Sequence, residues 1–390
     1  MLAATVYSLL QCAFRAAKSR PKCDLKVSRP EYIITRPNMY RAFFLLISAC
    51  MITSCGKSPG ATPSNPIGVA VAIAAPLGLP ALPIPGDNPP TVETIALGRR
   101  LFYERKLSTD STVSCASCHD PKFGFADPRP VSIGVGGKRG NRNAPPVLNA
   151  AYHPLQFWDG RATTLEEQAA GPIANQVEMN HPLEDCIRKL KADAQYVAQF
   201  DEAFGAGGIS LDRLKKAIAS FERTLLSADS PFDRYQFGED KKALSAAAVR
   251  GLEIFKDKNR GNCAVCHTIG EKDALFTDGK FHNIGEGIDP SGEILDLGRF
   301  DQTKLAADKG AFRTPTLRNI AKTAPYMHDG RIQTLKAVVD FYVGGGSSNP
   351  QLDKEIKELK LTGRERADLV EFLESLTGST PPDSGPPSKP

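Results

Sequence analysis

The chain has 390 residues and a formal net charge of +5, which is long enough for about two domains with hydrophobic cores. Its excess positive charge lies at the N-terminus. Residues 1–54 carry eight Lys and Arg against two acidic residues, so the rest of the chain has a net charge of −1. A basic surface for nucleic acid is therefore not expected. No apolar stretch after the N-terminal region is long enough to cross a membrane.

The first part of the chain resembles an export signal. Residues 39–55 read MYRAFFLLISACMITSC, a short basic start and an apolar core before small residues, which is the signal-peptide pattern. The ending ITSC is similar to a bacterial lipobox, so we expect Cys55 to carry a lipid and the protein to be periplasmic. An ordinary cleaved signal peptide is the alternative. Residues 1–38 fit neither scheme, which suggests that translation starts at Met39 and that 1–54 is a precursor segment.

Composition separates a tether, a folded region and a tail. Residues 55–90 are rich in Pro, Gly and Ala, and residues 378–390 lack apolar periodicity, so we expect a flexible tether and a disordered tail. Between them helical patterns dominate and long strand patterns are absent. Ser210 precedes an apolar stripe of helical spacing, and Thr362 with Glu365 forms a capping box. The sequence predicts a mainly α protein with long, structured loops.

An internal repeat indicates two similar domains. ALGRRLFYERKLSTDSTVSCASCH matches VRGLEIFKDKNRGNCAVCH, because each copy has a glycine, an apolar-Phe pair and then Cys-x-x-Cys-His. Two copies of one unit imply two similar domains, and the Cys-x-x-Cys-His motif that each contains is typical of cytochrome c-like domains. We place them at residues 91–235 and 236–377.

The two Cys-x-x-Cys-His motifs are signatures of covalent c-type haem attachment. Two thiols one turn apart can bond the two vinyl groups of one haem, and the next histidine can bind its iron. A zinc site would need four clustered ligands, and a redox dithiol would need no histidine. The sequence predicts two haems c, attached as follows: Cys115, Cys118 and His119 at the first haem; Cys263, Cys266 and His267 at the second.

A glycine-rich loop, SIGVGGKRGNRN at residues 132–143, follows the first motif. Its composition is compatible with a phosphate-binding loop, but no strand-to-helix context supports one. We expect the glycines to let backbone approach or swing away from a haem face. Of the remaining histidines, we expect His153 and His181 to be structural, and His282 and His328 to lie near the second haem.

The segment QFWDGRATTLEEQAAGPIANQVEM, residues 156–179, holds the candidate catalytic chemistry. Peroxide cleavage needs a group that moves a proton between the two oxygens. Glu178 could do so, Gln168 could hold the peroxide by a hydrogen bond, and the indole of Trp158 could shorten a path between two redox centres. From the residues alone, a surface helix with an acidic face is the preferred interpretation.

Residues 91–377 resemble the bacterial dihaem cytochrome c peroxidase family, in particular its MauG-like branch, in the blocks RNAPPVLNA, FWDGRA, AFRTPTLRN and APYMHDG. The resemblance implies that the first haem reacts with peroxide and the second handles electrons. It implies Glu178 as the acid–base residue, Gln168 as its companion, Pro172 in the same pocket and Trp158 between the haems.

The resemblance also implies a calcium ion between the domains. Its site would use Asn143 and the backbone of Thr314 to Thr316, of which Thr314 and Thr316 are the candidate ligands.

Two positions distinguish the branches of this family. Many members carry a histidine in the glycine loop that closes the first haem iron, whereas this chain has Val135, which has no lone pair to donate. We therefore expect a five-coordinate first haem that needs no reductive activation. At the second haem, Tyr342 stands where the MauG-like branch supplies a tyrosine ligand. Met327 is the alternative ligand, and a packed core aromatic is the alternative role of Tyr342.

The sequence therefore predicts a periplasmic peroxidase that reduces hydrogen peroxide with electrons from a cytochrome c or cupredoxin. One alternative is a MauG-like oxidase of a protein substrate, and another is a dihaem electron carrier or redox sensor without catalysis. We expect a membrane association only through the lipid, no nucleic-acid partner and a possible homodimer.

Overall fold

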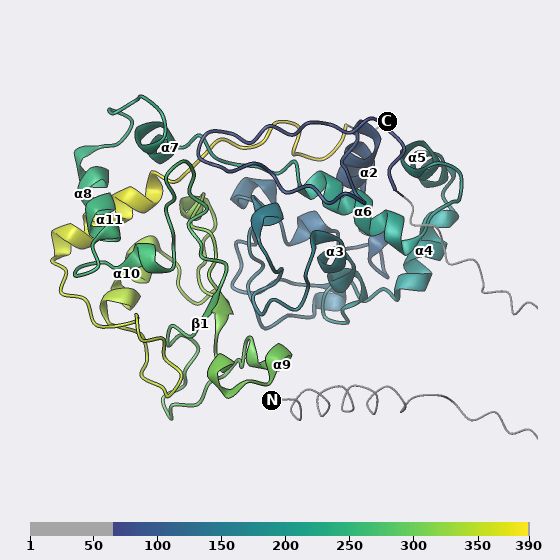
Figure 1. Ribbon diagram of the computed structural model, residues 1–390. Coiled ribbons are helices and arrows are strands. Elements are labelled where there is room, and N and C mark those ends of the chain that lie inside the picture. The colour runs from purple at the N-terminus through teal and green to yellow at the C-terminus, as the bar shows by residue number, and fades with distance from the viewer. Residues whose placement is uncertain (1–64, 389–390) are drawn as a thin grey trace, which may run out of the picture. The chain divides into compact units, whose positions relative to one another are not determined.

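The computed structural model describes residues 65–388, and the expectations for residues 1–64, including Met39 and Cys55, lie outside the described residues. Two groups of helices, each with a core of its own, make up the described part of the chain (Figure 1). The N-terminal group contains α2 (Val92–Phe102), α3 (Leu165–Ala174), α4 (Leu183–Lys191), α5 (Ala194–Phe204) and α6 (Leu211–Glu222). The C-terminal group contains α7 (Pro231–Gln236), α8 (Ala246–Lys256), α9 (Phe300–Thr303), α10 (Leu335–Val343) and α11 (Gly363–Glu374).

Strand structure is minimal among the described residues. The two strands β1 (Phe281–His282) and β2 (Phe312–Arg313) pair antiparallel, and most of the remaining chain forms turns and short 3₁₀ segments. The prediction of a mainly α protein with long, structured loops is confirmed. No helix among residues 65–388 is long and apolar enough to cross a membrane.

Both predicted helix starts agree with the structure. Ser210 caps α6 through the Arg213 amide, and Thr362 and Glu365 form the capping box of α11. Helix α8 begins at Ala246, because the Ser245 side chain accepts from the Ala248 amide. Cys186 of α4 is a free and fully buried thiol.

The internal repeat marks equivalent helix crossings in the two halves. Gly98 of α2 lies against the Ala217 carbonyl and Phe221 of α6, and a Cβ there would overlap the carbonyl. Gly251 of α8 lies in the same way against the Asp368 carbonyl and Phe372 of α11. Glycine is required at both positions because the helix backbones approach closely.

A second repeat, not recognised in the sequence, follows the first. It pairs residues 143–173 with residues 313–343 at a constant spacing. The shared features are the left-handed residues Asn149 and Asn319, the tight turns closed by the bridges Gln156–Ala162 and Tyr326–Ile332, and the N-caps Thr164 of α3 and Thr334 of α10. Pro172 and Tyr342 therefore occupy equivalent positions.

The expected tether at 55–90 is not free where the structure describes it. From residue 65 on, this segment is bound by hydrogen bonds to both halves: the Asp229 amide donates to the Leu77 carbonyl, the Ala274 amide to Gly78 and the Tyr152 hydroxyl to Pro80. Proline residues keep their carbonyl acceptors. The segment can therefore be bound by hydrogen bonds although its hydrophobicity is low.

The expected disordered tail is also docked as far as residue 388. The Ser379 amide donates to the Ala228 carbonyl, and Tyr103 and Arg99 donate to the carbonyls of Ser384 and Gly385. Figure 1 shows this segment, in yellow, running from α11 to α2. Backbone hydrogen bonds order this tail, although it lacks the apolar periodicity from which an ordered segment could have been predicted.

Candidate haem centres

The first Cys-x-x-Cys-His motif forms a tight turn that places all three side chains together. Cys115 opens a 3₁₀ turn, and the amides of Cys118 and His119 both donate to the Cys115 carbonyl, at 3.1 and 3.0 Å. The His119 Nδ1 lies 3.2 Å from the Phe125 carbonyl oxygen. Because a carbonyl only accepts, Nδ1 carries the proton and Nε2 keeps a lone pair for a metal.

The second motif repeats this geometry. The amides of Cys266 and His267 donate to the Cys263 carbonyl, and the His267 Nδ1 donates to the Phe276 carbonyl at 2.9 Å. Phe125 and Phe276 both have left-handed backbones, with φ of 58° and 52°. This conformation, strained for a bulky residue, aims each carbonyl at its histidine.

The residues of the second motif fit a haem. Cys263, Cys266 and His267 line one cavity of about 220 Å³ whose remaining wall is mainly apolar. Both cysteine pairs are free of disulfides, and burial raises the pKa of Cys263 to about 12 and that of Cys115 still further. Two reduced thiols, one imidazole lone pair and an apolar cavity are what covalent haem attachment requires. Among the described residues, Cys266 groups with Asp278 and His282, which gives three potential ligands, one fewer than a structural zinc site has.

The structure brings the candidate acid Glu178 and the glycine loop together. The Val135 amide donates to the Glu178 carbonyl at 2.8 Å, and Gly134 packs so closely on the Glu178 backbone that a Cβ would overlap it. The Val135 side chain is buried in one cluster with Ala169, Ile173 and Met179. The loop therefore supports the segment that carries the candidate acid.

The Glu178 carboxyl is largely buried at the end of this segment. Burial raises its pKa, while the charge of Arg161 and a hydrogen bond from the Asn175 amide group lower it. Desolvation is the larger effect, so the carboxyl holds its proton more tightly than a carboxyl in water. Asn175 fixes its orientation by donating to Oε1 at 2.5 Å.

The companions of Glu178 lie on α3. Gln168 is half-buried, and its side chain forms no hydrogen bond within the described residues, which leaves its amide free. Pro172 lies inside the helix, and its carbonyl accepts the Met179 amide at 3.2 Å. This bond joins α3 to the residue after Glu178, so Pro172 helps to fix the position of the carboxyl.

Trp158 lines the cavity of the second Cys-x-x-Cys-His motif, which we call the second cavity. Its indole Nε1 donates to the Asn143 carbonyl at 2.9 Å, and the Asn143 amide donates to the His328 carbonyl at 2.7 Å. Trp158, Asn143 and His328 all line this cavity, although Trp158 belongs to the N-terminal half. The indole thus reaches from the first domain to the second haem site.

Both candidate distal ligands of the second haem line the same cavity. Tyr342 lies on α10, and its hydroxyl forms no hydrogen bond with any residue that the structure describes. Burial strongly raises its pKa, and an iron ion would favour the phenolate instead. Met327 reaches the cavity from a left-handed turn position, with φ of 73°.

The candidate calcium ligands Asn143, Thr314 and Thr316 line one cavity, and each already forms hydrogen bonds within the protein. The Thr314 carbonyl accepts from the Thr277 hydroxyl at 2.7 Å and from the Arg313 guanidinium at 3.3 Å. The Thr316 hydroxyl donates to the Leu275 carbonyl, and the Asn143 side-chain amide donates to the backbone carbonyl of Arg129. The guanidinium of Arg313 beside the Thr314 oxygen opposes a cation there, and the calcium site stays a prediction.

Several charged residues near the second haem site come from distant segments. His282 lies between Asp278 and Asp353, with ring nitrogens 3.0 and 2.6 Å from their carboxylates, and its pKa is raised to about 10 by hydrogen bonding to Cys266 and these acids. His328 stacks on Phe312 with ring centroids 3.8 Å apart. The block FHNIG suggested His282, but no local pattern reveals the acid 71 residues away.

Comparison with known proteins identifies the family. The profile of the di-haem cytochrome c peroxidase family matches residues 92–241, and the cytochrome c profile matches residues 248–377. The chain is 39% identical to the methylamine utilization protein MauG of Methylorubrum extorquens, over 85% of this chain and 94% of that protein. The chain belongs to the di-haem cytochrome c peroxidase family. It is also 40% identical to cytochrome c551 peroxidase of Pseudomonas aeruginosa, over 73% of this chain and 79% of that protein.

Solved structures agree with this placement. A MauG-like protein associated with microbial copper homeostasis has a TM-score of 0.68 and 36% identity, covering 78% of this chain and 94% of that protein. The di-haem peroxidase BthA of Burkholderia thailandensis has a TM-score of 0.63 and 26% identity, covering 77% and 91%. The predictions of two cytochrome c-like domains, two c-type haems and a peroxidase-type oxidoreductase are therefore confirmed.

Proposed function

We propose that this member of the family is a periplasmic, lipid-anchored peroxidase that reduces hydrogen peroxide at an open first haem. The haems, when bound, supply iron that exchanges electrons with peroxide and with a donor. His119 and His267 are the proximal ligands, and their protonated Nδ1 atoms keep both rings in the tautomer that binds iron through Nε2.

Glu178 is the acid–base residue in this proposal. Its raised pKa brings the carboxyl toward the working pH, where it can take a proton from one peroxide oxygen and return it to the other. The free amide of Gln168 is available to orient peroxide. The single observation that carries this function is the buried Glu178, braced by Val135 and Asn175.

Val135 supports an open first site. Valine offers no electron pair to iron, and its side chain is buried in an apolar cluster. A first haem held by His119 would then receive no second ligand from this loop, and peroxide would have access to its iron without prior reduction.

Tyr342 favours a second candidate, a MauG-like oxidase that acts on a protein. A phenolate ligand lowers the reduction potential of haem iron, which disfavours simple electron acceptance from a cytochrome c. In that case peroxide consumption with a reduced cytochrome c or cupredoxin is slow, and a partner protein is modified instead. A calcium ion, a homodimer and a lipid on Cys55 stay predictions.

The experiment compares Glu178→Gln with Glu184→Gln, an exposed carboxylate on α4, in protein loaded with both haems. Loss of general acid–base catalysis lowers the rate of the peroxide reaction by about 10²-fold or more. Stopped-flow spectroscopy measures this rate, and equal haem content is the condition for comparison. An unchanged rate in Glu178→Gln would remove the acid–base assignment, and a ferric protein with no spectral response to peroxide would leave an electron carrier or sensor.

A further inference from the structure

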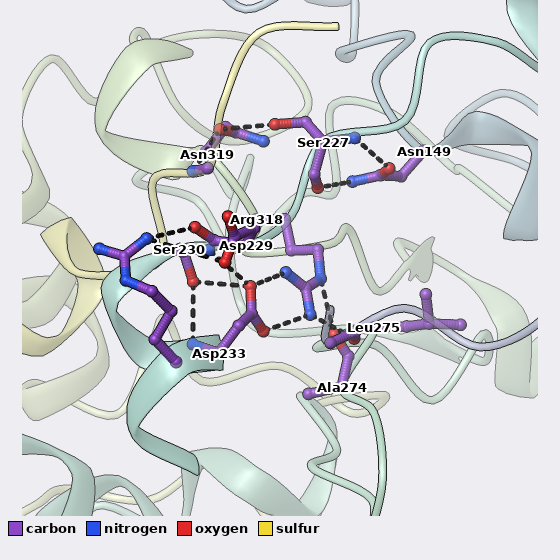
Figure 2. Close-up of polar contacts among 12 residues, drawn as sticks. Asn149, Ser227, Asp229, Ser230, Asp233, Ala274, Leu275, Arg318 and Asn319 are labelled. Atoms are coloured by element: carbon purple, nitrogen blue, oxygen red, sulfur yellow. Dashed lines mark hydrogen bonds and ion pairs between the residues drawn. The ribbon is translucent and has the colours of Figure 1, made fainter. Parts of the chain in front are cut away.

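Arg318 is the largest fully buried side chain among the described residues, and it has no role in the proposed chemistry. Its guanidinium forms two bonds of 2.9 Å with the Asp233 carboxylate of α7. It also donates to the Ala274 carbonyl at 2.7 Å and to the Gly78 carbonyl at 2.6 Å. Figure 2 shows this guanidinium between Asp233 and the segment that contains Ala274 and Leu275.

The segment that Arg318 holds leads directly to the proximal histidine. Residues 274–276 end in Phe276, whose left-handed backbone aims its carbonyl at the His267 Nδ1. Arg318 holds the first carbonyl of this segment, and the Thr316 hydroxyl holds the Leu275 carbonyl at 2.8 Å. Two side chains from one loop therefore fix consecutive peptides before the carbonyl that orients His267.

The first half achieves the same result without a charge. Leu148 occupies the position equivalent to Arg318, between the paired residues Pro145/Pro315 and Asn149/Asn319. There the Val147 amide donates to the Phe125 carbonyl at 3.1 Å, so backbone alone secures the acceptor of His119. The second half therefore has an arginine at a position where the first half folds with an aliphatic residue.

Burying an ion pair in a core has a free-energy cost that burying an apolar side chain does not have. Desolvating two charges cancels much of their attraction, and apolar replacements of similar size often fold as well. A guanidinium does offer five donors in a rigid fork, and Arg318 uses it on three segments that are far apart in the chain. That geometry suits a residue that fixes relative positions.

We propose that Arg318 is a positioning residue for the second haem: it holds residues 274–276 so that the Phe276 carbonyl orients His267, and it links this ligand to the N-terminal segment at Gly78. The inference rests on the proposed function in one respect, namely that His267 binds the second iron. A firmly held acceptor at Nδ1 increases the basicity of a ligating histidine and so favours ferric iron. Loosening it raises the reduction potential of the second haem.

The experiment uses the full protein with both haems and compares Arg318→Met with Arg250→Met. Arg250 is a matched control, because it forms a two-point pair with Asp368 at 2.8 and 2.7 Å in the same half, but on the outside of α8 and α11. Asp233→Asn provides a milder change that leaves Arg318 in place, in case Arg318→Met does not fold. Arg318→Lys keeps the charge but loses the fork.

The readouts are the midpoint potential of the second haem and its electron paramagnetic resonance g-values. We expect Arg318→Met to shift the reduction equilibrium about tenfold toward the ferrous form, which is 59 mV for a one-electron couple, with a smaller shift in the same direction for Asp233→Asn. Arg318→Lys should recover less than half of the shift. Arg250→Met should leave potential and g-values unchanged.

Two results overturn the inference. One is a set of potentials and g-values in Arg318→Met and Asp233→Asn that match Arg250→Met, and the other is full recovery by Arg318→Lys, since charge alone would then explain the effect. His267→Ala tests the underlying assignment separately. A changed electron paramagnetic resonance signal of the second haem supports His267 as the ligand, whereas an unchanged signal contradicts the proposed function whatever Arg318 does.

Discussion

The two halves of the molecule share one framework and differ in what fills it. Each has a glycine at a helix crossing, Gly98 or Gly251, and a left-handed phenylalanine, Phe125 or Phe276, whose carbonyl holds the proximal histidine. These features depend on backbone geometry. They can therefore be kept while the side chains around each haem site change.

The differences fall at equivalent positions around the two sites. Pro172 of α3 corresponds to Tyr342 of α10, and Trp158 corresponds to His328. After α3, the first half continues into the segment that carries Glu178, the proposed acid–base residue, whereas α10 ends in glycines. The comparison teaches that one haem-binding scaffold can present different chemistry at its two sites through a few positions on rigid elements.

The largest expected effect comes from breaking what the halves share. Gly98→Ala and Gly251→Ala each drive a Cβ into a carbonyl of the facing helix, so each should lower the free energy of unfolding by about 3 kcal/mol. Gly363→Ala is the control, because nothing lies within 4 Å of its Cβ, and it should be neutral or stabilising by up to about 1 kcal/mol. Denaturant titration followed by circular dichroism measures all three. Equal stabilities would mean that the crossings are not close.

Much of this framework could be predicted from the sequence, because it is encoded locally. The Cys-x-x-Cys-His spacing, the glycine and Phe pair before it, and the capping box at Thr362 each need only a few consecutive residues. The candidate site segment was recognised through a resemblance, since its residues alone also fit a surface helix. The structure adds how Val135 and Asn175 hold Glu178.

The parts that could not be predicted depend on contacts between distant residues. The Pro-rich segment before residue 90 and the tail after residue 378 are bound through backbone carbonyls, and composition carries no signal for that. Arg318 looked like an ordinary member of the block AFRTPTLRN, because its partners Asp233 and Gly78 lie 85 and 240 residues away.

The second prediction concerns access to the first haem. Val135→His introduces a nitrogen lone pair beside Glu178, and we expect the first haem to become six-coordinate and low-spin in the resting protein. If the histidine leaves the iron open a tenth of the time, the peroxide reaction slows about tenfold. Val135→Leu, which has no lone pair, should keep a high-spin resonance signal and the original rate. A high-spin signal in Val135→His would show that the loop does not reach the iron.

The third prediction separates the two tyrosines of the second cavity. Tyr342→Phe removes the proposed ligand oxygen, so it should change the electron paramagnetic resonance spectrum of the second haem and raise its reduction potential. Tyr326→Phe, also in the cavity wall, removes a hydroxyl that donates to the Ile320 carbonyl at 3.0 Å. It should cost about 1 kcal/mol of stability and leave the spectrum unchanged. Identical spectra in both variants would favour Met327 as the ligand.

The smallest expected effect concerns Glu222, a buried carboxyl at the end of α6 that is 5% exposed. One of its oxygens, Oε2, has no hydrogen-bond partner among the described residues. Its equivalent in the second half is Leu373, which lines the second cavity. Burial raises the pKa of Glu222 to about 8, Glu166 adds to this and Arg223 opposes it.

The folded protein therefore retains a proton on Glu222 up to about pH 8, whereas the unfolded chain releases it near pH 4.5. Between these values the unfolded state binds fewer protons, so stability falls as the pH rises. We expect the wild type to lose about 2 kcal/mol between pH 5 and pH 6.5 through this group. Glu222→Gln, neutral throughout, should remove that part of the pH dependence, and Glu222→Leu should do so while installing the residue of the second half. If the unfolding free energies of Glu222→Gln and wild type depend on pH in the same way, Glu222 is ionised in the folded protein, and the first half contains a buried negative charge where the second half has Leu373.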